Sequence, residues 1–410
     1  MRSAIVVSLL GACSPHVDFA PDEVDAISGL SPVPRPPSDP TNAWADDPNA
    51  ARLGQALFFS TALSSSGDVS CATCHDPSLG FGDAQRLSTG LGTTARHAPP
   101  LFNNAHQRWW GWAGAADSPW AQALGPIEDP DEMGSTRVGL VHVVVADPAL
   151  RDDYEGLFGP LPSAEGLPER ARPIPDDPDH PEALAWASLS EDTRDGVDTM
   201  FANLGKAIAA YERLLVSEDA PFDAFVAALV AGESVTEEHL DAAAQRGLRL
   251  FLGDAGCIGC HSGPLLTDHA FHNIGLAPRD WLDGEDQGRW DGAEVVLDDP
   301  FNGAGEHSDA PEEGAVALDT LYVGEDSRGA FKTPSLREVA RTAPYMHGGH
   351  FERLEEVLDH YDRLEESPAH GHTEETLQPL HLSVGERADL LAFLGALSGA
   401  PLDTALLGAP

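Results

Sequence analysis

The stretch Cys71-Ala72-Thr73-Cys74-His75 returns later in this 410-residue chain as Cys257-Ile258-Gly259-Cys260-His261. In a C-x-x-C-H motif the two thiols form thioethers to one edge of a haem, and the histidine becomes the proximal iron ligand. Zinc ribbons usually place their cysteine pairs much closer together, and a dithiol oxidoreductase has no need of a following histidine twice. The sequence therefore predicts two covalently bound haem c groups, with a zinc-binding structural protein as the alternative.

A weak internal repeat surrounds the two motifs. Gly54-x-x-Leu57-Phe58 precedes the first motif, and Gly247-x-x-Leu250-Phe251 precedes the second. An amphipathic helix is expected late in each half, over 197–216 and 384–397, and strand-like alternation is scarce. We therefore expect a mainly α fold of two cytochrome c-like domains, each with one haem, joined by long loops. The expected N-terminal domain covers 49–233, the C-terminal domain 234–400 and a tail 401–410, with a hinge at 231–235.

The first residues resemble a bacterial lipoprotein signal. Arg2 supplies a positive charge, residues 4–12 are a short apolar stretch, and Leu10-Gly11-Ala12-Cys13 matches the cleavage and lipidation site. The alternative is an ordinary secretory signal that happens to contain a cysteine. Residues 13–48 are rich in proline and aspartate and are expected to form an extended tether. The prediction is thus a periplasmic protein attached to a membrane only through lipid on Cys13.

The formal net charge of −43 excludes nucleic acid as an expected partner, because binding to phosphates needs clustered lysine and arginine. Residues 280–326 hold fifteen acidic residues and a single basic one, Arg289. A solvated surface insertion is favoured here over a docking patch for a basic partner.

Two further segments carry a family resemblance. The spacing Trp112-x9-Gln122-x3-Pro126-x5-Glu132-Met133 is similar to the bacterial di-haem cytochrome c peroxidases and their MauG-like relatives. So are the segments over residues 331–337 and 342–349. The likeness runs from about Arg52 to Gly399. It implies that the N-terminal haem reacts with hydrogen peroxide and that the C-terminal haem stores or relays electrons.

The resemblance also implies roles for single residues around the first haem. Glu132 matches the distal carboxylate that moves a proton from bound peroxide to the leaving oxygen, a transfer that cleavage of the O–O bond requires. Gln122 and Pro126 match positions that hold peroxide and limit access. Trp112 matches the tryptophan that relays electrons between the haems. Taken alone, Glu132 would be interpreted as an exposed carboxylate in an acidic loop.

The sixth ligand of the second haem separates the subfamilies. In the peroxidases a methionine follows the Pro-Tyr-x-His segment by fourteen residues, and in MauG-like enzymes a tyrosine stands there; here the residue is Tyr361. Tyr361 belongs to an apolar helical stripe and should face inward, so a core tyrosine with Met346 as the ligand is the alternative. A tyrosine ligand would stabilise higher iron oxidation states, whereas a thioether raises the reduction potential.

One departure from the family concerns calcium between the haems. The family places asparagine in an Arg-Asn-x-Pro segment, whereas this chain has Arg96-His97-Ala98-Pro99. The carbonyl groups of Thr342 and Pro344 are candidate ligands, but an imidazole is a poor ligand for this oxygen-seeking ion. Calcium is therefore a doubtful cofactor.

These observations together predict an exported di-haem oxidoreductase. Peroxide would react at the haem ligated by His75, and oxidising equivalents would pass through Trp112 to the haem ligated by His261 and Tyr361. MauG-like oxidation of a protein or aromatic substrate is the favoured function, and a cytochrome c peroxidase fed by a small cytochrome is the close alternative. A non-enzymatic di-haem electron carrier is the alternative of another class. A homodimer is compatible with the family.

Overall fold

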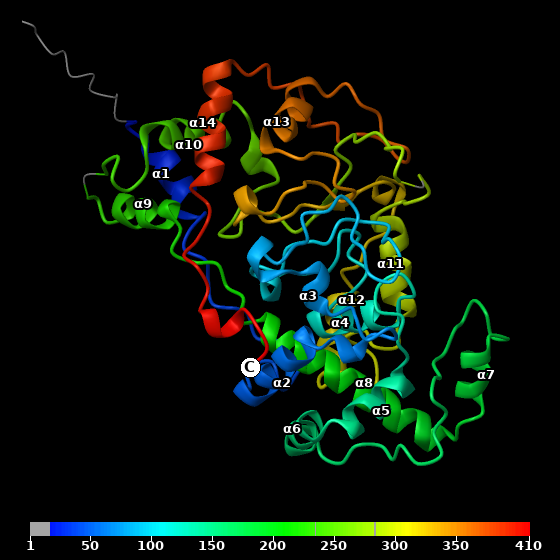
Figure 1. The fold of residues 1–410 in the computed structure, drawn as a ribbon. Coiled ribbons are helices and arrows are strands. Elements are labelled where there is room, and N and C mark those ends of the chain that lie inside the picture. The colour runs from blue at the N-terminus through cyan, green and yellow to red at the C-terminus, as the bar shows by residue number, and fades with distance from the viewer. Residues whose placement is uncertain (1–16, 234, 283) are drawn as a thin grey trace, which may run out of the picture.

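The computed structural model describes residues 17–233, 235–282 and 284–410. The expected signal and Cys13 therefore lie outside the described residues. The described chain is mainly helical, and its strands are two residues long and form one antiparallel pair (Figure 1). The helices are α1 Pro21–Ser28, α2 Pro48–Phe59, α3 Cys71–Cys74, α4 Pro119–Glu128, α5 Arg137–Ala146, α6 Pro148–Phe158, α7 Pro181–Ala187, α8 Glu191–Glu212, α9 Pro221–Val230, α10 Ala242–Leu252, α11 Arg289–Asp298, α12 Pro311–Leu318, α13 Leu354–Arg363 and α14 Val384–Gly395; the strands are β1 Phe271–His272 and β2 Phe331–Lys332.

The N-terminal lobe is built on the packing of α2 against α8, with α4 on the other side of α8. Leu53, Leu57 and Phe58 of α2 are buried in the core between these helices. Gly54 explains how closely the two helices approach, because a Cβ at this position would overlap the backbone carbonyl of Ala207 on α8. The glycine of the repeat is therefore a crossing point of two helices.

The C-terminal lobe repeats this arrangement with α10 and α14 (Figure 1). A Cβ on Gly247 of α10 would overlap the carbonyl of Asp389 on α14, as at the first crossing. Phe251 and Phe393 lie in the core, with ring centroids 5.1 Å apart. The internal repeat seen in the sequence thus corresponds to one helix crossing in each lobe, which supports the expected pair of similar units.

The lobes exchange segments in a way that the expected boundaries do not anticipate. Helix α9 lies before the boundary expected at 233, yet Phe222 and Phe225 are part of the C-terminal core. Residues 17–48 do not form an extended tether. Ile27 of α1 is buried in the C-terminal core, and Asn42 donates a hydrogen bond to the carbonyl of Lys206 on α8. The apolar side chains between the prolines make this packing favourable, because they leave water on contact with the lobes.

The acidic stretch, residues 280–326, is likewise more than a solvated insertion. It follows the second C-x-x-C-H motif, yet Phe301 packs into the N-terminal core and Asp309 forms a 2.9 Å ion pair with Lys206. The tail also returns to the N-terminal lobe, where the carbonyl of Leu406 accepts a 2.6 Å hydrogen bond from Tyr211. Residues 17–48, the C-terminal tail and the acidic stretch therefore connect the two lobes.

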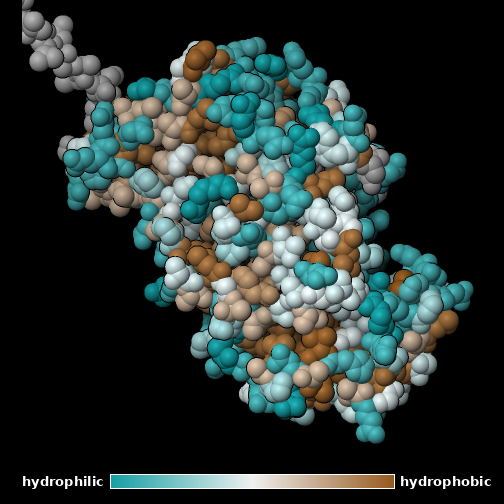
Figure 2. Space-filling model, in the orientation of Figure 1, coloured by the Kyte–Doolittle hydropathy of each residue, from teal (hydrophilic) through white to brown (hydrophobic). Residues whose placement is uncertain are grey.

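The surface of the described chain is mostly hydrophilic on the face shown in Figure 2, with apolar side chains interspersed. Among the helices of the described residues, none is both long enough and apolar enough to cross a bilayer.

Candidate functional site

The first C-x-x-C-H motif forms the short helix α3 and the residue that follows it. The Nδ1 atom of His75 lies 3.0 Å from the carbonyl oxygen of Phe81, and the backbone of Pro99 also faces the ring. Phe81 adopts a φ of 58°, a left-handed conformation that few non-glycine residues take. Burial lowers the pKa of His75, so the ring is neutral. A neutral imidazole oriented through Nδ1 is the form that binds iron through its other nitrogen.

The second motif reproduces this geometry. The Nδ1 atom of His261 lies 2.9 Å from the carbonyl oxygen of Leu266, and the backbone of Pro334 faces the ring. Leu266 has a φ of 54°, again in the left-handed region. Burial lowers the pKa of His261 as well. Backbone strain of this kind persists where the surroundings enforce it, and here it sets the orientation of both candidate iron ligands.

The four cysteines of the motifs are free thiols rather than disulfides. Burial raises the pKa of Cys71 and Cys257 to about 12 and that of Cys74 to about 11. Paired thiols beside a neutral histidine oriented through Nδ1 fit the attachment of one haem in each lobe.

Glu132 lies next to the first motif. Its charge is close enough to raise the pKa of both Cys71 and Cys74. Burial, together with the charges of Asp129 and Asp131, raises the pKa of Glu132 itself to about 7. This carboxyl can thus gain and lose a proton near neutral pH, as a general acid–base group must.

Gln122 and Pro126 share α4, whose first turn is capped by the Ser118 side chain. Pro126 is inside the helix, and its carbonyl accepts a 3.2 Å hydrogen bond from the backbone of Met133, the residue after Glu132. The helix that carries Gln122 is therefore tied to the turn that carries Glu132.

Trp112 lies where the lobes meet. Its indole Nε1 donates a 2.7 Å hydrogen bond to the carbonyl of His97, and its own carbonyl accepts a 2.9 Å hydrogen bond from the backbone of Lys332 on β2. His97 is in turn connected to the C-terminal lobe, since its backbone N–H donates to the carbonyl of His347 at 2.7 Å. The position expected for an inter-haem tryptophan is thus fixed from both lobes.

Tyr361 lies on α13 beside the second motif. Its surroundings include Cys257 and Cys260, whose charges would raise its pKa further, and burial raises that pKa most strongly. Met346, the alternative ligand, lies in a turn with a φ of 71°.

The comparisons with known proteins show the family of this chain. The family profile described as di-haem cytochrome c peroxidase matches residues 48–230. The methylamine utilization protein MauG of Methylorubrum extorquens is 33% identical over 402 residues, an alignment that covers 97% of this chain and 91% of that protein. The chain belongs to the di-haem cytochrome c peroxidase and MauG family.

Two more proteins that are similar to this di-haem oxidoreductase represent the two branches of the family. Cytochrome-c peroxidase IdrP1 of Pseudomonas sp. is 30% identical over 415 residues, covering 97% of this chain and 91% of that protein. A solved structure described as a MauG-like protein associated with microbial copper homeostasis is 26% identical and matches with a TM-score of 0.63, covering 92% of this chain and 97% of the other. Peroxidases and MauG proteins are thus similar to this chain at nearly the same identity.

The donor set of this family member fits the calcium site poorly. His97 is buried, and its Nδ1 lies 2.7 Å from the carbonyl oxygen of Gln85. The hydroxyl of Thr342 faces the carbonyl of Val339 at 3.4 Å. No oxygen ligand replaces the family's asparagine at position 97, so calcium at Thr342 and Pro344 stays an untested prediction.

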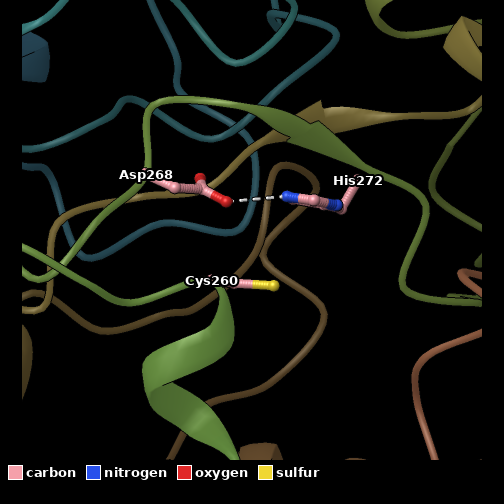
Figure 3. A group of neighbouring side chains, drawn as sticks. All are labelled: Cys260, Asp268 and His272. Atoms are coloured by element: carbon pink, nitrogen blue, oxygen red, sulfur yellow. Dashed lines mark hydrogen bonds and ion pairs between the residues drawn. The ribbon is translucent and has the colours of Figure 1, made fainter.

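A cluster beside the second haem motif brings together Cys260, Asp268 and His272 (Figure 3). The Nε2 atom of His272 lies 2.9 Å from Asp268, and its Nδ1 lies 3.0 Å from Glu374. Hydrogen bonding to Asp268, then to Cys260, raises the pKa of His272 to about 11. A thioether would occupy the Cys260 sulfur, which would leave His272 paired with the carboxylates of Asp268 and Glu374.

The sequence reasoning missed a buried carboxyl in the N-terminal lobe of this enzyme. Glu212, at the end of α8, accepts a 2.6 Å hydrogen bond from Asn104, and burial raises its pKa to about 7. The charge of Glu212 also contributes to the raised pKa of Cys71. The only sequence signal is a glutamate inside an apolar helical stripe, which does not reveal its partner.

Proposed function

We propose that the protein uses hydrogen peroxide to oxidise a protein or aromatic substrate, in the manner of the MauG branch. The electrons gained and lost in this reaction balance. Peroxide takes up two electrons and two protons and leaves as two water molecules, and the substrate loses two electrons. The bound haems would supply iron centres that react with peroxide and hold oxidising equivalents. The residues described above would supply the protons, the orientation and the connection between lobes.

Glu132 is the proton carrier in this proposal. Its pKa of about 7 allows it to accept a proton from the peroxide oxygen nearer the metal and to donate it to the departing oxygen. Gln122 and Pro126 on α4 would position peroxide and limit the entry of water. The hydrogen bond from Met133 to Pro126 keeps the carboxyl and this helix in register.

Trp112 is the connection between the two reaction sites. Its indole is held from the N-terminal lobe by the His97 carbonyl, and its backbone is held from the C-terminal lobe by Lys332. An aromatic ring fixed in this manner needs no conformational change before an electron moves across the interface.

The proximity of half-buried Tyr361 to Cys257 and Cys260 supports the assignment to the MauG branch. In this proposal the phenol oxygen would be the sixth ligand of the second haem iron, which favours higher oxidation states over rapid electron uptake. The cytochrome c peroxidase alternative requires a thioether there, and Met346 is the candidate for it.

The experiment compares Tyr361→Phe with Tyr345→Phe in the haem-loaded protein. Tyr345 is the matched control, because it is also a half-buried tyrosine of the C-terminal lobe, and its hydroxyl donates to the Val339 carbonyl. We expect Tyr361→Phe alone to change the electron paramagnetic resonance spectrum of one haem. Unchanged spectra, or steady peroxide-dependent oxidation of reduced cytochrome c by the wild type, would favour the cytochrome c peroxidase.

We also propose a periplasmic location with lipid on Cys13, and a protein redox partner. Mass spectrometry of the protein isolated from membranes would detect a diacylglyceryl group on Cys13. A soluble protein cleaved elsewhere would refute the anchor while leaving the redox function unaffected.

A further inference from the structure

Two buried basic side chains lack an acidic partner. Five arginines and lysines in the described part of the chain are buried. Three of these form ion pairs with carboxylates: Arg137 with Glu128 and Asp198, Lys206 with Asp309, and Arg337 with Asp223. The other two, Arg289 and Lys332, have no carboxylate partner among the described residues, although the chain carries 67 acidic residues.

Arg289 and Lys332 meet at the same short segment, residues 109–114. The guanidinium carbon of Arg289 lies 4.4 Å from the ring centroid of Trp109 and 4.3 Å from that of Phe271. Its Nη1 donates a 2.7 Å hydrogen bond to the carbonyl of Gly114. Lys332 donates from Nζ to the carbonyl of Trp109 at 2.9 Å. Both cations therefore donate to neutral carbonyl groups of this segment, and Arg289 also stacks on two aromatic rings.

This arrangement is costly without an anion. Taking an ammonium or guanidinium group out of water costs several kcal/mol unless a counter-charge is present. Burial alone lowers the pKa of Lys332 to about 7 and that of Arg289 to about 10. The nearest acids in the sequence are engaged elsewhere, because Asp286 pairs with Arg96 and Asp291 accepts from Gln287. An anion from outside the described residues would supply the missing counter-charge.

Lys332 also lies close to the second haem attachment. It belongs to the segment 331–334, and the backbone of Pro334 at the end of this segment faces the His261 ring. Its partner across the strand pair is Phe271, the ring on which Arg289 is stacked. We propose that Arg289 and Lys332 bind the propionate carboxylates of the haem attached at Cys257 and Cys260. The proposal rests on haem binding by this family and not on the peroxide chemistry.

Redox titration of the haem-loaded protein, followed by visible spectroscopy, tests this pair. Positive charges beside a haem favour its reduced state, so Arg289→Gln and Lys332→Gln should each lower the reduction potential of the second haem. We expect the ratio of reduced to oxidised haem at a fixed potential to fall about tenfold, which corresponds to about 59 mV for one electron. Lys332→Arg should retain the potential, because it retains the charge.

Lys206→Gln is the matched control, since it removes a buried cation that already has a carboxylate partner on the N-terminal lobe. It should leave the second haem unchanged. Arg289→Met and Lys332→Met, which remove the charge but keep a long apolar side chain in the buried site, provide the same test if the glutamine variants do not fold. Unchanged potentials in both glutamine variants would overturn the proposal, and so would a shift confined to the first haem.

A free carboxylate from solution is the other source of a negative charge beside Arg289 and Lys332. In that case the wild-type potential would respond to acetate at constant ionic strength, and Arg289→Gln would abolish the response. That result would overturn haem binding by this pair. Peroxide turnover is not measured in any arm, so the outcome is independent of the proposed reaction.

Discussion

Replacing Glu132 with glutamine tests the proposed proton transfer most directly. Glutamine preserves the shape of the side chain but can neither accept nor release the proton. Positioned general acid–base groups contribute about 100- to 10,000-fold to a rate, and we expect a loss in this range for the reaction with peroxide. The haem spectra should stay unchanged, because Glu132 is not an iron ligand in the proposal.

The pH dependence of the rate with peroxide is a second quantity that can be predicted. The pKa of Glu132 is about 7, mainly through burial and then through the charges of Asp129 and Asp131. The carboxylate form accepts the proton, and with this pKa it makes up about a tenth of the protein at pH 6 and about nine-tenths at pH 8. The wild-type rate should therefore rise roughly tenfold over this interval, whereas an ordinary glutamate would give a flat profile.

Stability should respond to the same raised pKa. Between pH 4.5, the ordinary pKa of a glutamate, and about pH 7 the unfolded chain releases a proton from Glu132 that the folded chain retains. Folding stability contributed by this group is therefore present at low pH and lost as the pH rises through this window. Glu132→Gln should remove that loss, which thermal unfolding at a series of pH values would measure.

Stopped-flow mixing with peroxide, followed through the haem absorbance, is the assay for the rates. Asp131→Asn is the control, because removing a like charge should lower the pKa of Glu132 and move the acid limb to lower pH. The reasoning is refuted if Glu132→Gln reacts at the wild-type rate, or if the wild-type rate does not change between pH 6 and 8.

Three further predictions concern the helix crossing, the lobe interface and a buried ion pair. Gly54→Ala should destabilise the protein by about 1–3 kcal/mol in chemical denaturation, because the new Cβ would overlap the Ala207 carbonyl. The control Gly156→Ala lies at an open helical position and should stabilise the protein by about 0.5–1 kcal/mol. Equal effects of the two substitutions would contradict the helix crossing at Gly54. Trp112→Phe should slow substrate oxidation while the initial reaction with peroxide keeps its rate, and parallel losses in stopped-flow experiments would argue against a relay. Arg337→Met should cost about 3–5 kcal/mol of unfolding free energy, since it leaves the carboxylate of its buried pair uncompensated, and a loss below about 1 kcal/mol would show that water reaches the pair.

The sequence was informative where chemistry depends on local spacing. Each C-x-x-C-H motif is a single turn, so the relation of Cys71 to His75 follows from covalent geometry. The position of Glu132 near this motif came from the family resemblance, and its proximity to both cysteines in the structure is consistent with that expectation. The glycines of the repeat were visible as a pattern, but only the structure shows that Gly54 marks a helix crossing.

The sequence was less informative where packing depends on contacts between distant segments. Residues 17–48 look like a tether because prolines suppress periodicity, yet the isolated Ile27 is fully buried. Arg289 looks like one basic residue in a solvated acidic stretch, whereas it is buried against Trp109 and Phe271. Neither environment can be inferred locally, because the partners lie far away in the chain and composition alone does not identify them.

The exchange of segments between lobes has a consequence for the modularity of the protein. Each lobe carries one C-x-x-C-H motif, but the C-terminal core includes Ile27 and α9, and the N-terminal core includes Phe301. A chain divided at residue 233 would give two fragments that each expose a surface normally filled by the other. The two lobes therefore form one folding unit, in which the spacing between the two motifs is set by the fold and not by a flexible linker.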